Sequence, residues 1–251
     1  MNLHTYPTLV SAAKAAAEIV AEQLRNKPNS NLGLGAGDTF VPFYEELVRM
    51  NLDKEAPFNK FRSFQVNEFL GMPGTHPMSF RFFLVDSFLD YVPAVRRFQK
   101  RLPGLPVNSA STCRGFEERI KKAGGLDIVL VDLGVHDWVG FNEKGTPFES
   151  KTREVTLSEE LRSHYAPLFP RGSVPRRGIT MGIKTILDAR RIVLLVGGEH
   201  KAPALARMFT APLSPAVPST ALRKHPKVDV FADAVAASEL PASKRRAATN
   251  V

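Results

Sequence analysis

Apolar residues recur at helical spacing in several segments of the chain. Residues 8–26 are rich in alanine, and Val10, Ala13 and Ala17 begin an apolar pattern that continues to Leu24. Because this spacing is close to the helical repeat, the segment is predicted to form a helix. Other segments predicted to be helical are 41–52, 79–92, 111–125 and 179–189.

Shorter apolar runs between these segments predict strands. The run at 126–135 is the clearest, because it is continuous and rich in β-branched residues. Further strands are predicted at 31–34 and at 61–67. The segment 190–209 is predicted to form a strand, a glycine turn and a helix, and the segment 227–238 a strand and a helix. This alternation, without a long Ser/Gly/Pro linker, predicts one α/β domain with a mostly parallel sheet covered by helices on both faces.

The composition fits such a domain and excludes several other classes of protein. Hydrophobic residues make up 43% and charged residues 24% of the 251 residues, which excludes disorder throughout. Cys113 is the only cysteine, so a disulfide scaffold and a cysteine-rich zinc site are excluded. No apolar run reaches the roughly 18–20 residues that span a bilayer. The N-terminus also lacks the pattern of a secretory signal, so a cytoplasmic location without membrane contact is expected.

The net charge of +9 comes from 34 Lys+Arg against 25 Asp+Glu. Such a surplus fits either binding to nucleic acid or membranes, or an anionic small substrate together with a basic tail. Lys244, Arg245 and Arg246 lie among small residues near the C-terminus, and the other basic residues are scattered. We therefore expect no nucleic-acid partner, a domain at 1–241 and a flexible basic tail at 242–251.

Candidate binding residues follow the predicted strands, because ligands of parallel sheets bind beyond the carboxyl ends of the strands. The first glycine turn carries Gly35, Gly37, Asp38 and Thr39 before a helix, and its backbone N–H groups predict an anion site. A tight turn without a ligand is the alternative, since the pattern matches neither common nucleotide-binding motif. Lys201 follows a second glycine turn and is placed to add a positive charge, although a surface lysine would look the same.

Candidate acid–base residues follow the clearest strand, where His136, Asp137, Trp138 and Glu143 lie close together. An imidazole and carboxylates suit proton transfer, and the lone tryptophan suits a pocket wall or a lid. One histidine with two carboxylates makes a poor metal site, so no metal is expected. From the residues alone, the ligand is expected to be an anionic small molecule, and the reaction stays open. Another strand end offers Asn67 and Glu68.

Taken in order, these segments resemble the glucosamine-6-phosphate deaminase/isomerase family. The family segments LGLxTGxTPxxxYxxL and DEYVGLPxxHPxSYxxF correspond to LGLGAGDTFVPFYEEL and NEFLGMPGTHPMSFRFF. The segments GGIDLxLxGIGxDGHIAFNEPG and SRTRxxTL correspond to GGLDIVLVDLGVHDWVGFNEKG and SKTREVTL. VPxxAxTxGxxTLLDA, ILVxGxxKAxAL and SALQxHP correspond to VPRRGITMGIKTILDA, LLVGGEHKAPAL and TALRKHP. The resemblance covers roughly residues 30–235.

The resemblance implies a Rossmann-like three-layer sandwich, as in sugar-phosphate isomerases and CoA transferases, and a homo-oligomer. It also implies a cofactor-free reaction on an amino-sugar phosphate. An imidazole helps to open the pyranose ring, a carboxylate moves a proton from C2 to C1, and ammonia leaves to give a ketose phosphate. The phosphate cradle of the family falls on Gly37, Asp38 and Thr39, with Lys201 as the cationic partner and Arg171 as a substitute for a further arginine.

Three of the four catalytic positions of the family are changed in this sequence. The proton-shuttling aspartate falls on Asn67, the ring-opening histidine on Trp138 and its orienting aspartate on His136, while Glu143 retains the glutamate. An amide cannot abstract a carbon-bound proton, and losing a positioned acid or base costs on the order of 10²–10⁴-fold in rate. The unmodified mechanism of the family is therefore not expected.

The favoured hypothesis is an enzyme that acts on a hexosamine or hexose 6-phosphate with a rearranged site. In this hypothesis His136 is the acid/base, Asp137 or Glu143 orients it, and Glu68 takes the proton-transfer role. The preference for an enzyme rests on the fold class and the retained anion site.

A second hypothesis is a catalytically weak homologue that binds a sugar phosphate as a sensor or regulatory subunit, with Asn67 and Trp138 in the binding site. A third is 6-phosphogluconolactonase activity. It fits less well, because that related family has a GHTAS-like sequence where this chain has WVGFNE.

Overall fold

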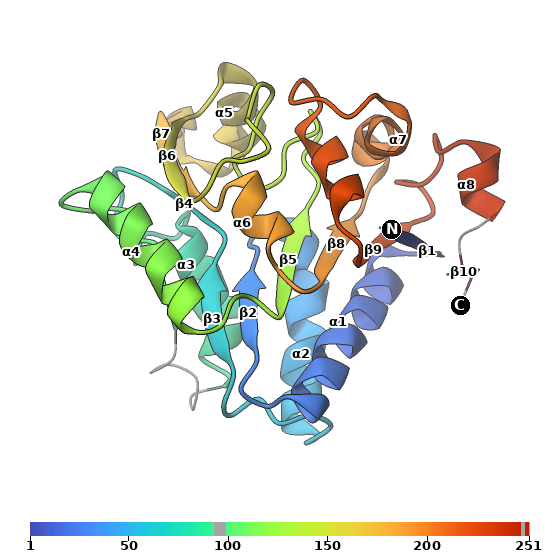
Figure 1. Cartoon of the computed structure of the whole chain (residues 1–251), viewed down its shortest axis with the longest axis horizontal. Coiled ribbons are helices and arrows are strands. Elements are labelled where there is room, and N and C mark those ends of the chain that lie inside the picture. Colours follow the sequence, from blue (N-terminus) through green and yellow to red (C-terminus); the bar gives the residue numbers. More distant parts are fainter. Residues whose placement is uncertain (93–98, 247–248, 251) are drawn as a thin grey trace.

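The described residues fold into an α/β structure built on two β-sheets (Figure 1). The computed structural model describes residues 1–92, 99–246 and 249–250. The larger sheet is parallel, and its seven strands have the order β10-β1-β9-β8-β5-β2-β3. These strands are β1 (Asn2–Tyr6), β2 (Asn31–Leu34), β3 (Arg62–Gln65), β5 (Ile128–Asp132), β8 (Ile192–Val196), β9 (Val228–Asp233) and β10 (Thr249–Asn250).

Helices cover both faces of the parallel sheet. Side chains alternate between the faces of a strand, so Ile128 and Leu130 of β5 pack with α1 and α2, whereas Val129 and Val131 pack with α4, α6 and α7. The predicted three-layer α/β architecture with a mostly parallel sheet is therefore confirmed. These helices are α1 (Leu9–Asn26), α2 (Val41–Leu52), α4 (Ser109–Lys122), α6 (Ile183–Leu187) and α7 (Ala202–Thr210).

The first helix shows how local sequence defines an element. The side chain of Thr8 accepts the N–H of Ser11, and Ser11 Oγ accepts the N–H of Thr8, so the two residues form a capping box at the start of α1. Alanines on the buried face, Ala13 and Ala17 among them, have no exposed surface. The helix predicted at 8–26 is confirmed by these contacts and by its observed bounds.

A second sheet contains three antiparallel strands in the order β4-β7-β6. The strand predicted at 61–67 is divided between the two sheets, because β3 joins the parallel sheet and β4 joins the second. Val66 lies between them, and its N–H donates to the carbonyl of Leu34 (3.1 Å) while its own carbonyl accepts from Met181 (2.7 Å). The strands of the second sheet are β4 (Asn67–Phe69), β6 (Arg153–Thr156) and β7 (Arg177–Thr180).

The helix predicted at 179–189 is wrong in its first half. Ile179 has no exposed surface and lies in β7, where it pairs with Glu68 of β4 and Glu154 of β6. Its backbone therefore belongs to a strand and not to a helix. The helix expected after β9 is also absent: residues 234–239 form turns. The strand β1 was not predicted. The remaining short elements are α3 (Phe80–Leu84), η2 (Val85–Leu89), α5 (Glu159–Tyr165), η1 (Asp38–Phe40), η4 (Ala166–Leu168), η5 (Pro170–Gly172), η6 (Glu199–Lys201), η7 (Pro218–Lys224) and α8 (Ala242–Arg246).

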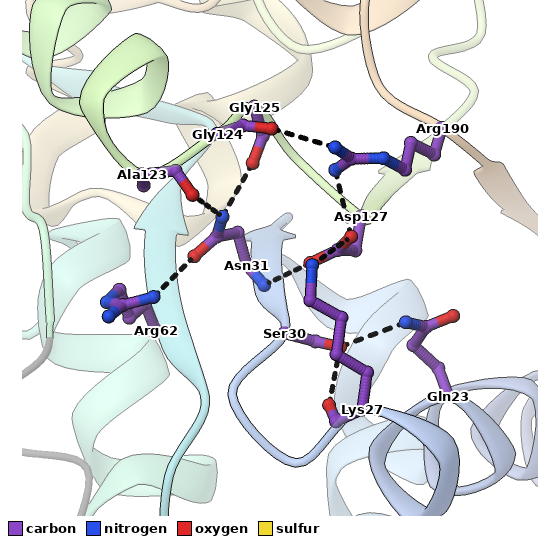
Figure 2. A network of polar contacts seen from close by, with 10 residues as sticks. All are labelled: Gln23, Lys27, Ser30, Asn31, Arg62, Ala123, Gly124, Gly125, Asp127 and Arg190. Atoms are coloured by element: carbon purple, nitrogen blue, oxygen red, sulfur yellow. Dashed lines mark hydrogen bonds and ion pairs between the residues drawn. The ribbon is translucent and has the colours of Figure 1, made fainter.

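A network of polar contacts ties together the amino ends of β2, β3, β5 and β8 (Figure 2). Asp127 accepts hydrogen bonds from Lys27 Nζ (2.8 Å), Arg190 Nη1 (2.9 Å) and the backbone N–H of Asn31 (2.8 Å). The amide of Asn31 donates to the carbonyls of Ala123 (2.8 Å) and Gly125 (2.7 Å). These bonds fix the loops that precede the central strands.

Two further predictions concern the surface and the C-terminus. Among the described residues, none of the helices combines the length and the apolar character that crossing a membrane requires. The division into a domain at 1–241 and a tail at 242–251 stays a prediction. In the part of the tail that the structure describes, 242–246 forms α8, and 249–250 forms β10 beside β1.

Candidate active site

A pocket of about 450 Å³, called the central pocket below, lies at the carboxyl end of the parallel sheet. The glycine turns after β2 and β8 contribute to it, and Asp132 at the end of β5 lies in the sheet order between them. The opposite wall is apolar and comes from the second sheet, α3 and the segment that follows α5. The side chains that form this wall are Phe69, Met78, Phe80, Phe83, Tyr165, Leu168 and Phe169.

The first glycine turn is fixed by close packing. A Cβ on Gly35 would lie 2.7 Å from the ring of Phe40 and 2.8 Å from the carbonyl oxygen of Leu130, so only glycine fits there. The hydroxyl of Tyr44 donates to the carbonyl of Gly35 (2.5 Å). Gly37 has a φ of +132°, which side-chain-bearing residues rarely adopt. The turn thereby brings the backbone of Gly37 and of the following residues to the pocket.

Lys201 joins the two turns inside the pocket. It is 5% exposed, and its ammonium donates to Thr39 Oγ1 (2.8 Å) and lies 3.3 Å from Asp132 Oδ2. An ammonium has three N–H bonds, and among the described residues Thr39 and Asp132 are its hydrogen-bond partners. One N–H bond is therefore left for a ligand in the pocket. Asp38 is exposed at the rim, where its carboxylate adds negative charge.

His164 and Tyr165 close one side of the central pocket. Partial burial lowers the pKa of His164 below its ordinary value of 6.5, the nearby ammonium of Lys201 lowers it further, and Asp132 opposes this effect. The imidazole is thus held in its neutral, proton-accepting form near neutral pH. Burial raises the pKa of Tyr165 well above its usual range, so this phenol stays protonated.

Four of the predicted site residues line a different cavity, called the second hollow below. It has a volume of about 610 Å³ and is lined by His136, Asp137, Trp138 and Glu143, together with parts of β6, α5 and α7. Trp138 is 4% exposed, and its indole covers Gly134, where a Cβ would lie only 1.8 Å from the indole Nε1.

Contacts around the second hollow tie the loop after β5 to its neighbours. Asp137 has a φ of +69° and pairs with Arg207 (2.9 Å). Burial raises the pKa of Asp137, and the hydrogen bond and charge of Arg207 act in the opposite direction. Glu143 accepts the backbone N–H of Ser158, the N-cap of α5 (3.0 Å). Both carboxylates thus hold secondary structure in place.

The other predicted site residues lie away from both cavities or outside the description. Glu68 has no exposed surface, and its carboxylate accepts from Gln65, from Ser79 Oγ and from backbone N–H groups at the start of α3. Asn67 is 6% exposed in β4, where it pairs with Thr180, and is not among the described residues that line the central pocket. Arg171 belongs to η5, but its side chain lies outside the described part of the structure.

The structure therefore brings together Gly37, Asp38, Thr39 and Lys201, and it separates them from the predicted acid–base residues. All of these roles stay predictions. Sequence reasoning missed Asp132 and His164, which do line the central pocket. Asp132 is the last residue of the observed strand β5, but it lies inside the longer strand predicted at 126–135. His164 lies in a stretch that carries no motif.

The family model for glucosamine-6-phosphate isomerases/6-phosphogluconolactonase matches residues 8–231. This chain belongs to that family. Glucosamine-6-phosphate deaminase of Shewanella halifaxensis is 38% identical over 92% of this chain and 88% of its own length. The enzyme of the same name from Thermoanaerobacter pseudethanolicus is 36% identical over 91% of each chain.

Solved structures of family members have the same fold. A monomeric glucosamine-6-phosphate deaminase superposes with a TM-score of 0.92 at 33% identity, covering 95% of this chain and 100% of that chain. A 6-phosphogluconolactonase from Trypanosoma brucei has a TM-score of 0.75 at 17% identity, covering 96% of this chain and 98% of that chain, and shows the fold alone. The family resemblance and the fold predicted from it are confirmed.

The donor groups of the site do not favour a metal ion. Among the described residues, no group of three or more His, Cys, Asp or Glu side chains is arranged to hold one. The polar lining of the central pocket instead combines one buried ammonium with carboxylates that range from buried to exposed and with exposed imidazoles. This set is suited to binding a small anion and to transferring protons.

Proposed function

We propose that this family member is an enzyme that binds a hexosamine or hexose 6-phosphate in the central pocket and converts it by acid–base catalysis. The observation that carries the proposal is Lys201, a buried ammonium that bridges the two glycine turns and keeps an N–H bond for an anion. The phosphate is held by the backbone of Gly37, Asp38 and Thr39 together with Lys201.

For an amino-sugar phosphate the reaction is a deamination. The ring opens, a proton moves from C2 to C1, and water replaces the amine, so that a ketose phosphate and ammonia are formed. The names of the similar proteins support this substrate class, because the relatives compared above are glucosamine-6-phosphate deaminases. A cytoplasmic homo-oligomer stays the expectation for the assembly, although one similar structure is of a monomeric enzyme.

The test is a substrate panel with the purified full chain. Glucosamine 6-phosphate and other hexosamine and hexose 6-phosphates are incubated with the protein, and ammonia and ketose phosphate are measured. Unphosphorylated glucosamine is the matched control, because it lacks only the group that Lys201 would bind. Turnover that requires the phosphate supports the proposal, and absence of turnover with every phosphorylated sugar overturns it.

Asn67 and Trp138 support a second function, a sugar-phosphate sensor without turnover. The amide of Asn67 cannot act as a base, and the buried indole of Trp138 occupies the position of the ring-opening histidine of the family. Calorimetry on glucosamine 6-phosphate separates the functions, since a sensor binds the ligand and releases no ammonia. The double variant Asn67→Asp/Trp138→His sharpens the test. A gain of deaminase activity in this variant would show that the scaffold and the phosphate site are intact and that only the catalytic groups were altered.

A further inference from the structure

The central pocket contains an imidazole and a carboxylate that the family pattern does not assign. His164 comes from α5, and Asp132 is the last residue of β5, so the two groups reach the pocket from different elements. Neither the amide of Asn67 nor the indole of Trp138 can transfer a proton from carbon. The pocket itself therefore offers the groups for the chemistry that these two positions have lost.

His164 lies directly beside the position of the missing histidine. Its ring centroid is 5.5 Å from that of Trp138, at an interplanar angle of 68°, and 5.0 Å from that of Tyr165, at 82°. These edge-to-face contacts with two aromatic rings favour this orientation of the imidazole. The ring of His136 lies 5.6 Å from that of Trp138 and borders the second hollow. An imidazole is thus retained next to position 138, but α5 supplies it.

Asp132 stands where the corresponding family segment has the first glycine of GIG. Its side chain is 29% exposed, and its Oδ2 lies 3.3 Å from Lys201 Nζ. A carboxylate oxygen at this place in the pocket can accept a proton from a bound substrate. Of the other described carboxylates in the pocket, Asp233 accepts the N–H groups of Gly198 (2.9 Å) and Ala236 (2.7 Å) and is occupied by the second turn.

We infer that His164 and Asp132 are the catalytic acid–base pair of the central pocket, a deepening that rests on the function proposed above. His164 takes the proton of the C1 hydroxyl and delivers it to the ring oxygen as the C1–O5 bond breaks. The O1–H electron pair becomes the aldehyde C=O bond, so the open-chain sugar forms without any other reactant.

Asp132 then takes the proton from C2. The C2–H electron pair forms the C1=C2 double bond, and the π pair of the aldehyde takes a proton from the ammonium group on C2. Return of the proton from Asp132 to C1 gives an iminium at C2, which water hydrolyses to the ketone and ammonium. Each step uses only the substrate, water and these two side chains.

Charged and titratable groups from several elements face His164. Lys201 and His200 after β8, Asp132 at the end of β5 and His136 on the following loop act on it. On its own helix, Glu160 lies beside it in a shallow hollow shared with His136. Since Lys201 disfavours the imidazolium, the rate is expected to fall as pH drops below the ordinary range of histidine.

The experiment compares His164→Gln and Asp132→Asn in the full chain with glucosamine 6-phosphate as substrate. Each substitution is expected to lower kcat on the order of 10²–10⁴-fold. Binding of inorganic phosphate should persist in both variants. In Asp132→Asn it should tighten, because the substitution removes a negative charge that lies beside Lys201 and repels the phosphate. Added imidazole should restore part of the activity of His164→Ala, a readout that a merely structural role would not produce.

Matched controls use the same residue types at positions that do not line the central pocket. His4→Gln in β1 and Asp188→Asn after α6 should keep the rate of the unmodified protein. If His164→Gln and Asp132→Asn retain full activity while His136→Gln or Glu143→Gln loses it, the inference is overturned and catalysis belongs to the second hollow. Absence of turnover by the unmodified protein overturns the proposed function and the inference together, whereas turnover that survives both substitutions overturns the inference alone.

Discussion

Polar residues gather at both ends of the parallel sheet, but their partners differ. At the amino end, Asp127 is 3% exposed and accepts hydrogen bonds from Lys27, Arg190 and Asn31, all of them protein groups (Figure 2). At the carboxyl end, Lys201 is 5% exposed, yet its ammonium faces a pocket. Two charged side chains that are buried to a similar degree therefore differ in their partners: Asp127 belongs to a closed hydrogen-bond network, and Lys201 belongs to an open pocket.

This difference shows which end stabilises the fold and which end is available for function. A buried polar group whose hydrogen bonds are made within the protein contributes to stability, and removing one partner leaves another group without its bond. A buried charge that faces a pocket can instead give part of its interaction energy to a ligand. Substitutions at the two ends should therefore change different measurements.

The largest effect is expected for Asp127→Ala. The substitution leaves the buried N–H of Asn31 without its acceptor and removes the pairs with Lys27 and Arg190. The free energy of unfolding should fall by about 2–4 kcal/mol, measured by urea denaturation. The affinity of the folded fraction for inorganic phosphate should not change. Asp188→Ala, which removes an exposed ion pair with Lys184, is the control and should cost about 0–1 kcal/mol. A cost below that of the control would contradict the stabilising role of the network.

Lys201→Gln should have the opposite profile. Loss of a charged hydrogen-bond donor is expected to weaken binding of inorganic phosphate and of glucosamine 6-phosphate about 10–100-fold, measured by calorimetry. Its effect on the free energy of unfolding should be smaller than that of Asp127→Ala, because Asp132 and Thr39 can be hydrated from the pocket. Lys184→Gln, on the surface of α6, serves as the control. Unchanged affinity in Lys201→Gln would show that the pocket binds its ligand elsewhere.

The smallest effect concerns the dependence of stability on pH. The pKa of His164 is lower in the folded protein than its ordinary value of 6.5, so the stability linked to this group is present above that pH. It is lost as pH falls through the lowered pKa, because the partly buried imidazole must then take up a proton beside Lys201. Unfolding of the unmodified protein and of His164→Gln, measured between neutral and mildly acidic pH, should show the unmodified protein losing more stability on acidification. A parallel pH dependence would contradict this prediction.

Local patterns in the sequence were enough for most of the parallel sheet and its helices. The continuous apolar run that contains β5 and the alanine-rich pattern of α1 each depend on residues close in the chain. The second sheet could not be predicted in this way. Its strand β7 is short and contains Gly178, and it is extended because it pairs with β4 and β6, which lie far away in the sequence.

The same distinction holds for the candidate site. The glycine turn after β2 and the motif around Lys201 are local features, and their contact across the sheet follows from the adjacent positions of β2, β5 and β8. Asp132 was missed because the strand was predicted to continue to residue 135, whereas β5 ends at Asp132, and the candidates were taken from the residues that follow the strand. His164 was missed entirely, because its place in the pocket depends on how α5 packs against Trp138.

By itself, the sequence determined the α/β class, the family and the two turns that bring Thr39 and Lys201 together. These features follow from the periodicity of apolar residues and from motifs of residues that are neighbours in the sequence. They therefore do not depend on how distant segments of the chain pack. Only the tertiary structure decided that His136 and Glu143 border a second hollow while Asp132 and His164 enter the central pocket. The direction of a side chain at a strand end depends on packing from distant segments, here the contact of Trp138 with His164 of α5, and local sequence does not specify that packing.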